Sequence, residues 1–387
     1  MKAVIIGAGR VGLGCAAQIA HCGGLEVVVL GRGQVVQGLK RHERVQIETV
    51  HGPRSERHDV PVQALDLTIE RDRAVEEIAD ADLVLTAVGP AQLPSIANLL
   101  GAGLERAGGS VDVVALENTE DAGDHLRHRV GAAGTGHGFS GAVVDRVVAR
   151  RDLGNDSAPV SVVVEPACRV TIDGPALTRD WSWLPGVRST TSFAADYRAK
   201  LYCFSAGHAT AAYLGQLKGY RYLHAAVTDP EIAAVVLGAM EEGRRGLLHR
   251  YGLDVAGSPE ALVAILHRFS NAALGDTTLR VGRDVPRKLA RDDRLVGAAR
   301  LAYRAGAEPT QLGLAVAAAL QAHLGPHQLP PAGSPARLRQ ISTLTGLRPA
   351  HPLIEIVDRL WADLGEPAAL LSLRTGLPAW ESLRRAA

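Results

Sequence analysis

Hydrophobic and polar positions follow different patterns in the two halves of the chain. Up to about residue 150, short apolar runs alternate with segments of helical periodicity. The strand-like runs are KAVIIG (2–7), LEVVVLG (25–31), ADLVLTAV (81–88) and VDVVALEN (111–118), and the first helical segment is VGLGCAAQIAHC (11–22). Strands and helices that alternate at this spacing predict a parallel, doubly wound α/β sheet. The stretch SVVVEPACRVTIDGP (161–175) predicts further strand that extends this sheet.

The pattern changes at a turn, LPGV, near residue 185. Beyond it the periodicity is helical almost throughout, and the predicted helices cover 231–252, 258–270, 311–325 and 352–365. We therefore expect an α/β N-terminal domain over residues 1–185, followed by a mostly α-helical C-terminal domain over residues 186–387.

Composition and charge restrict the class of protein. The chain has 387 residues, of which 47% are hydrophobic and 21% charged, as in globular proteins. A net charge of +1 provides no overall field for nucleic acid or an anionic membrane. No apolar run is long enough to span a bilayer. Glycines interrupt the apolar start of the chain, which argues against a secretory signal peptide. We expect no nucleic-acid or membrane partner; the sequence leaves the oligomeric state open.

Four cysteines, at positions 15, 22, 168 and 203, are scattered without paired spacing. This usage suits a reducing compartment and matches neither a disulfide framework nor a zinc site. The sequence therefore predicts a cytoplasmic protein without a metal centre.

A glycine-rich turn, GAGRVG, follows the first predicted strand and opens the first predicted helix. Gly7, Gly9 and Gly12 have G-x-G-x-x-G spacing, with Arg10 and Val11 between them. The glycines permit a tight turn and let backbone N–H groups approach a pyrophosphate at the helix N-terminus. The motif predicts a Rossmann domain that binds a dinucleotide through these five residues.

The end of the second predicted strand bears on which dinucleotide binds. NAD-binding domains usually carry an acidic residue there for the ribose 2′-hydroxyl, whereas this chain has Gly31, Arg32 and Gly33. An arginine fork can hold a 2′-phosphate. We therefore expect NADP(H) to be preferred over NAD(H), with Arg32 as its ligand and Arg10 as a second candidate. The alternative is that Arg32 stacks on the adenine or points into solvent.

The segment 199–215 places a lysine and a histidine in an otherwise apolar, hydroxylic helix. In a regular helix Lys200, Ser205 and His208 lie within an arc of about 140° and can face one pocket. Burial lowers the pKa of an ammonium, so Lys200 is a candidate general base, with His208 orienting the substrate oxygen. The alternative is a surface lysine and a core histidine.

The stretch KLYCFSAGHATAAYLG (200–215) resembles the K-x-x-x-x-N-x-x-H motif of the polyol-specific long-chain dehydrogenase (mannitol dehydrogenase) family. Other blocks that resemble the family, in family order, are LTAVGP (85–90), ALEN (115–118), AVVDRVV (142–148), HRFSN (267–271) and RVGRDVPRKL (280–289). The resemblance covers nearly the whole chain. Its compact length and the last block look most like the mannitol-1-phosphate 5-dehydrogenase branch.

The resemblance implies a metal-independent, NAD(P)-dependent dehydrogenase that interconverts a polyol phosphate and a ketose phosphate. Lys200 then matches the general base, His208 the residue that positions the reacting oxygen, and Asn118 a residue that stabilises the oxyanion. The resemblance also assigns cofactor contacts to Ala87, Val88, Asn118 and Asp145, and polyol contacts to Asp145, Arg280 and Lys288.

Basic residues are concentrated in the block 280–294. Arg283 and Arg287 are candidate ligands of a substrate phosphate, because guanidinium forks match phosphate oxygens. The alternative is a solvated helix face with ion pairs along it. Acidic residues interrupt the block and no aromatic residues are interleaved, which argues against nucleic-acid binding.

Two departures from the family pattern leave other functions open. Ser205 replaces the motif asparagine as the candidate oxyanion donor, and CRVTID (168–173) stands where the branch has an acidic and aromatic stretch. One alternative is a family member retuned to a cyclitol or pentitol phosphate in specialised metabolism. Another is a catalytically silent regulator that binds NADP(H), which Ser205 supports and the intact Lys200, His208 and Asn118 oppose.

Overall fold

The computed structural model describes residues 1–325 and 330–364, and the chain divides into two compact units. The first unit is Met1–Tyr197 and the second begins at Arg198. Strand β12 (Val187–Thr190), which lies beyond the predicted boundary at residue 185, belongs to the first unit.

An eight-stranded sheet forms the centre of the first unit, in the order β12-β11-β8-β7-β6-β1-β2-β5. Its other strands are β1 (Lys2–Ile6), β2 (Glu26–Gly31), β5 (Gln63–Asp66), β6 (Leu83–Thr86), β7 (Asp112–Ala115), β8 (Gly138–Asp145) and β11 (Arg169–Asp173). Neighbours from β8 to β5 run parallel, and β11 runs antiparallel to β8. The parallel part is a doubly wound Rossmann sheet, which confirms the predicted α/β class.

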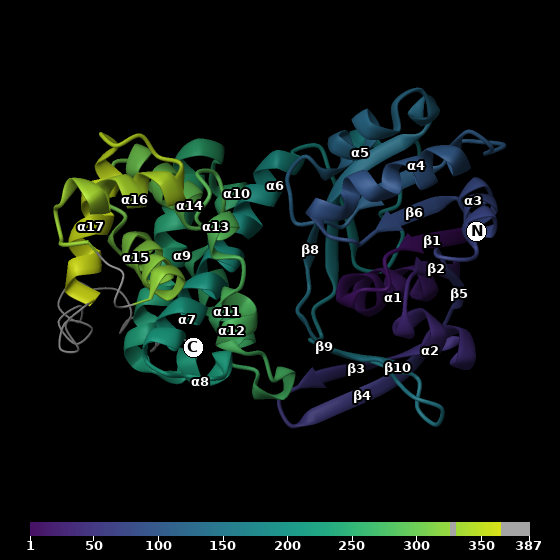
Figure 1. Ribbon diagram of the computed structural model, residues 1–387, viewed down its shortest axis with the longest axis horizontal. Helices are drawn as coiled ribbons and strands as arrows, with labels where there is room; N and C mark the ends of the chain where they lie inside the picture. Colours follow the sequence, from purple (N-terminus) through teal and green to yellow (C-terminus); the bar gives the residue numbers. More distant parts are fainter. Residues whose placement is uncertain (326–329, 365–387) are drawn as a thin grey trace. The chain divides into compact units, whose positions relative to one another are not determined.

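Helices cover both faces of this sheet (Figure 1). On one face lie α3 (Arg71–Ala79), α4 (Leu93–Leu104) and α5 (Ala122–Val130); on the other lie α1 (Ala17–Cys22) and α2 (Gln34–His42). Within β1, Val4 and Ile6 pack with the first group, whereas Ala3 and Ile5 pack with the second. Because both faces are covered, the strands read as continuous apolar runs in the sequence.

A second, four-stranded sheet in the same unit has the order β4-β3-β10-β9. It contains β3 (Arg44–His51), β4 (Arg54–Pro61), β9 (Val148–Asp152) and β10 (Val160–Val164). The prediction that 161–175 extends one sheet is therefore wrong for its first part. β10 pairs with β3 and β9, and only β11 joins the main sheet. Pro166 lies between the two strands and, lacking an N–H, favours a break in the run.

Helices account for nearly all regular structure of the second unit, which confirms the helical class predicted for this half. They are α6 (Phe193–Lys200, entering from the first unit), α7 (Ala206–Leu217), α8 (Leu223–Thr228), α9 (Pro230–Tyr251), α10 (Leu253–Ala256), α11 (Pro259–Phe269), α12 (Thr278–Gly282), α13 (Val285–Lys288), α14 (Val296–Arg304), α15 (Thr310–Leu324), α16 (Pro335–Thr345) and α17 (Pro352–Leu364).

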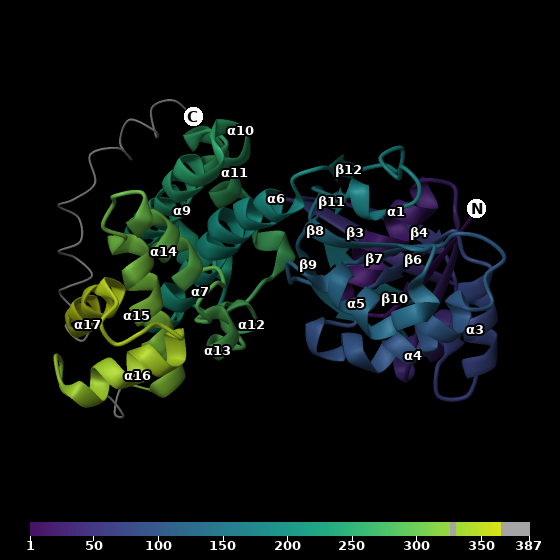
Figure 2. The ribbon, with the colours of Figure 1, turned by 90° about the horizontal axis from the view of Figure 1, so that it is seen from above.

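Helices α7, α9 and α15 pack against one another (Figure 2). Helix α15 is buried on all sides over 312–320, which explains its almost wholly apolar sequence. The described residues also contain short helical turns: η1 (Gly12–Ala16), η2 (Pro90–Gln92), η3 (Gly131–Gly134), η4 (Gly174–Ala176), η5 (Leu201–Ser205) and η6 (Ala272–Leu274). Across residues 1–325 and 330–364, no helix combines the length and the hydropathy needed to cross a membrane.

Candidate active site

The glycine turn between β1 and η1 is closely packed. Gly7 has a φ of +122°, and a Cβ there would lie 2.6 Å from the Ala87 carbonyl oxygen. A Cβ on Gly12 would lie 2.0 Å from the Gly7 carbonyl oxygen, whereas one on Gly9 would make only an ordinary contact at 3.5 Å. Side chains at Gly7 and Gly12 are thus excluded by backbone atoms that cannot move aside. This close packing fits the G-x-G-x-x-G pattern, in which glycines allow a tight turn beside a pyrophosphate.

A buried carboxylate joins the loops that follow β6 and β7. Glu117 is 2% exposed and accepts hydrogen bonds from Thr86 Oγ1 at 2.7 Å and from the Val88 N–H at 2.9 Å. Burial raises the pKa of this carboxyl. The bonds place Ala87, Val88 and the neighbouring Asn118 at the sheet edge that also carries the glycine turn. Sequence reasoning missed Glu117, although an acid directly before Asn118 at a strand end was the available signal.

Polar residues lie at the other strand ends of this edge. Arg32 follows β2 and is exposed, and no hydrogen bond or ion pair joins its guanidinium to another residue of the described chain. Asp145 ends β8, where it pairs in register with Arg169 of β11. From β9, Arg151 donates to the Ala8 carbonyl oxygen at 2.6 Å and so braces the glycine turn. Sequence reasoning did not identify Arg151, because its contact crosses between the two sheets.

The predicted Lys200–His208 helix differs from a regular α-helix. A π-helical turn, η5, separates α6 from α7, so the assumption of 100° per residue between Lys200, Ser205 and His208 is wrong. A π-turn adds a residue locally and rotates the next part of the helix, and such turns are frequent at functional sites. Ser205 is buried at the end of the turn, while Lys200 and His208 are half-buried. The Lys200 Nζ lies 5.9 Å from the centroid of the Phe204 ring.

The imidazole of His208 is held from two sides. It stacks on Phe269 with ring centroids 4.9 Å apart, and its Nε2 lies 3.6 Å from Asp276 Oδ2. Burial lowers the pKa of His208 and outweighs the opposing effect of Asp276. The imidazole is therefore neutral at neutral pH. Asp276 favours the tautomer with a proton on Nε2, which leaves Nδ1 as a hydrogen-bond acceptor.

Asp276 is the residue that organises this cluster. It is 5% exposed, and both of its carboxylate oxygens accept hydrogen bonds from the Arg280 guanidinium. Although burial opposes ionisation, the His208 and Arg280 side chains hold the pKa of Asp276 at about 2. Its carbonyl oxygen accepts from the Leu223 N–H at 2.9 Å, which fixes the segment to the start of α8. Sequence reasoning missed Asp276; its position four residues before Arg280 was the available signal.

The basic residues of the block 280–294 have different partners in the structure. Arg280 is paired with Asp276, and Arg287 donates to Asp284 at 2.6 Å. Arg283 is exposed, and its guanidinium forms no ion pair with any residue of the described ranges. Of the two predicted phosphate ligands, Arg283 is therefore the one whose guanidinium remains open to an external anion, whereas that of Arg287 is engaged.

Lys288 is buried, at 4% exposure, and its ammonium donates to the Arg283 carbonyl oxygen. Burial, followed by repulsion from Arg294 and Arg287, lowers the pKa of Lys288 to about 7. Between Arg283 and Lys288, Asp284 adopts a φ of +59°, a conformation that costs a non-glycine residue free energy. The block is thus a tight turn around a buried amine rather than a regular solvated helix face.

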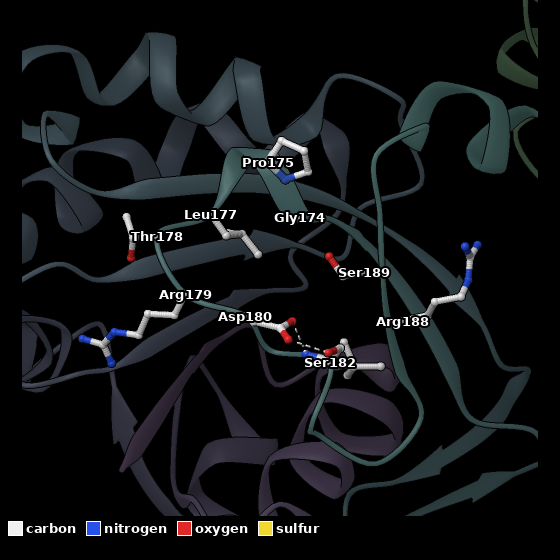
Figure 3. Close-up of a pocket in the computed structure, with 10 residues that line it drawn as sticks. Gly174, Pro175, Leu177, Thr178, Arg179, Asp180, Ser182, Arg188 and Ser189 are labelled. Atoms are coloured by element: carbon white, nitrogen blue, oxygen red, sulfur yellow. Dashed lines mark hydrogen bonds between the residues drawn. The ribbon is translucent and has the colours of Figure 1, made fainter.

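The first unit also has a surface hollow, which is lined by residues other than the predicted site residues. Figure 3 shows it where the chain connects β11 to β12, lined by residues between Gly174 and Ser189. Its Arg179 is engaged, because it donates to Asp82 at 2.7 Å. None of the predicted site residues lines this hollow. Over the residues that the structure describes, no cluster of three or more His, Cys, Asp or Glu side chains is arranged to hold a metal ion.

Comparison with known protein families matches both units. A model of the mannitol dehydrogenase Rossmann domain matches residues 1–183, and a model of the mannitol dehydrogenase C-terminal domain matches residues 196–327. The relatives include mannitol-1-phosphate 5-dehydrogenase of Bacillus licheniformis, 33% identical over 83% of this chain and 88% of the relative. That of Arthrobacter sp. is 33% identical over 93% of this chain and 97% of the relative.

Solved structures show the same fold. Mannitol 2-dehydrogenase of Pseudomonas fluorescens, solved as a ternary complex with NAD and D-mannitol, superimposes with a TM-score of 0.80 and 17% identity, covering 97% of this chain and 95% of that chain. A D-sorbitol dehydrogenase has a TM-score of 0.73 and 15% identity, covering 96% of this chain and 94% of that chain. With its two domain types, its relatives and this fold, the chain belongs to the mannitol dehydrogenase family.

Proposed function

We propose that this protein is a NAD(P)-dependent oxidoreductase that interconverts mannitol 1-phosphate and fructose 6-phosphate. The observation that carries the proposal is the cluster of His208, Asp276 and Arg280 on the same helical unit as Lys200. The names and identities of the relatives supply the substrate class. We further propose that residues 1–185 hold the cofactor and contribute Asn118, and that residues 186–387 supply the other catalytic side chains.

In this proposal the backbone of Gly7, Gly9, Arg10, Val11 and Gly12 holds the pyrophosphate. Further contacts come from Ala87, Val88, Asn118 and Asp145. The closely packed glycines fit such a ligand, since any side chain at Gly7 or Gly12 would collide with backbone. When bound, a nicotinamide supplies the carbon that accepts or returns a hydride.

The chain's own residues handle the proton and the oxyanion. In the oxidative direction Lys200 Nζ takes the proton of the reacting hydroxyl, and in the reductive direction it returns it. The neutral His208 orients the reacting oxygen, with Asp276 holding its tautomer. Asn118 and Ser205 donate hydrogen bonds to the developing oxyanion. Asp145, Arg280 and Lys288 supply the proposed polyol contacts, and Arg283 supplies the proposed phosphate contact.

Replacing Arg283 tests the proposed contact with the substrate phosphate. We expect Arg283→Ala to lower kcat/KM for fructose 6-phosphate by about 10- to 100-fold, because a charge-assisted bond to the phosphate is lost. Fructose, which lacks the phosphate, should be reduced equally by parent and variant. The matched control is Arg287→Ala, which removes a guanidinium already engaged by Asp284. Steady-state NAD(P)H oxidation at 340 nm measures both, and a larger loss for Arg287→Ala would assign the phosphate to that residue instead.

A preference for NADP(H) is the second proposal. Arg32 is exposed after β2, and the carboxylate of Asp66, in register with Gly31 on the neighbouring strand, is engaged by Thr68 and Gln37. A 2′-phosphate would therefore meet a guanidinium rather than an unengaged acid. We expect NADPH to bind more tightly than NADH, and Arg32→Ala to remove about 10- to 100-fold of that difference. Fluorescence titration of both cofactors decides this, and equal affinities in the parent refute it.

Nothing in the comparisons supports a retuned cyclitol or pentitol phosphate substrate, or a silent regulator. A panel of phosphorylated ketoses and cyclic ketones tests this directly: the proposal requires fructose 6-phosphate to give the highest kcat/KM. We also propose a cytoplasmic location, which the four free thiols of the described chain support.

A further inference from the structure

Two cysteines far apart in the sequence meet inside the first unit. Cys15 lies in η1, directly after the glycine turn, and is fully buried. Cys168 lies in the connection between β10 and β11 and is half-buried. A side-chain hydrogen bond joins the two thiols. Cys168 is thus only partly buried, and its thiol has the fully buried Cys15 as its neighbour.

A buried arginine accompanies this pair. Arg146 is 8% exposed, and its Nη1 lies 3.1 Å from Cys168 Sγ while also donating to Gln18 Oε1. Its Nε has no hydrogen-bond partner, and within the described residues no carboxylate forms an ion pair with its guanidinium. A buried cation without a counter-ion is costly. The thiolate of Cys168 is the anion placed to balance it.

The surroundings of the two thiols shift their pKa values in opposite directions. The hydrogen bond from Cys15 and the Arg146 guanidinium lower the pKa of Cys168 to about 7, against burial and the negative charge of Glu165. The bond to Cys168, then burial and Asp145, raise the pKa of Cys15, although Arg146 opposes this. Cys168 is therefore the thiolate of the pair and Cys15 the thiol.

We infer that Cys168 is a peroxide-reactive site and that Cys15 resolves its oxidised form as a disulfide. In the first step the Cys168 thiolate attacks hydrogen peroxide, so that an S–O bond forms and the O–O bond breaks. Cys168 is oxidised to a sulfenic acid, and the peroxide is reduced to hydroxide, which takes a proton to become water. In the second step the Cys15 sulfur attacks Cys168: an S–S bond forms, the S–O bond breaks, and hydroxide leaves with the Cys15 proton as water.

The first step favours the second because it removes the main cause of the raised pKa of Cys15. The largest cause of the raised pKa of Cys15 is its bond to the neighbouring sulfur. A neutral sulfenic acid no longer opposes ionisation of Cys15. The other cysteines serve as internal references: Cys22 is exposed, and burial raises the pKa of Cys203 to about 12.

Mass-spectrometric mapping of the full-length, reduced protein after graded hydrogen peroxide tests this inference. We expect a Cys15–Cys168 disulfide that a thiol reductant reverses. In Cys15→Ser, dimedone should instead trap a sulfenic acid on Cys168, whereas Cys22→Ser, the matched control, should behave as the parent. Oxidation of Cys22 before Cys168, or the absence of a Cys168 adduct in Cys15→Ser, overturns the inference.

The role of Arg146 has a separate readout. Iodoacetamide labelling of Cys168 in the parent should rise with pH around a midpoint near 7 and should exceed that of Cys22 at pH 7. Arg146→Gln should slow Cys168 labelling at pH 7 by about tenfold, because the thiolate fraction falls, and Arg146→Lys should retain most of the rate. A Cys168 labelling profile in the parent that matches that of Cys22 refutes the assignment even if Arg146→Gln does not fold.

Discussion

Replacing Lys200 by methionine is expected to reduce kcat/KM by about 10²- to 10⁴-fold, the usual contribution of a positioned general base. Methionine keeps much of the side-chain length beside Phe204 but cannot accept the hydroxyl proton. The affinity for NADPH should be unchanged, because the glycine turn is untouched. Steady-state kinetics with fructose 6-phosphate and cofactor titration measure the two quantities separately.

Two controls distinguish lost chemistry from lost structure. Lys40→Met removes an exposed lysine that is paired with Glu70, and it should keep full activity. In Lys200→Ala, added methylamine should restore part of the rate, because the missing amine is supplied from solution. If Lys200→Met retains activity within about threefold of the parent, Lys200 is not the base.

Replacing Asp276 by asparagine should affect both stability and turnover. The amide leaves the half-buried Arg280 without its buried counter-ion, and we expect the free energy of unfolding to fall by about 3 kcal/mol. Because His208 also loses the partner that holds its tautomer, kcat should fall by about 10- to 100-fold. Urea unfolding and the pH profile of kcat measure these effects. Asp284→Asn, which breaks an exposed pair with Arg287, should cost no more than about 1 kcal/mol.

The stability effect of Asp276 should also depend on pH, with a definite sign. The folded-state pKa of about 2 lies below the ordinary aspartate value of 3.8, so the carboxylate contributes stability that is fully present above about pH 4. This contribution is lost as the pH falls from about 4 towards 2. The gap between parent and Asp276→Asn should therefore narrow over that range. An equal gap at pH 6 and at pH 2.5 would contradict the assigned ion pair.

The local sequence pattern predicted much of the structure of the first unit. The alternation of apolar runs with helical segments indicated the doubly wound sheet, because both faces of its strands are covered and the strands are therefore continuously apolar. The glycine spacing indicated a turn that the structure contains, because backbone atoms exclude a side chain at Gly7 and Gly12. These features depend on residues close together in the chain, and each leaves its own mark on the sequence.

Tertiary structure decided which distant segments meet. The pattern of residues 161–175 marks strands but not their partners, since the hydrogen-bonding edge of a strand is backbone and carries no side-chain signature; β10 accordingly joins a second sheet. The π-turn before His208 was not predicted, because the sequence analysis assumed a regular helix there. Asp276 reaches His208 from more than sixty residues away. The sequence determined the fold class and the candidate residue types, whereas long-range packing determined which of them have charged partners.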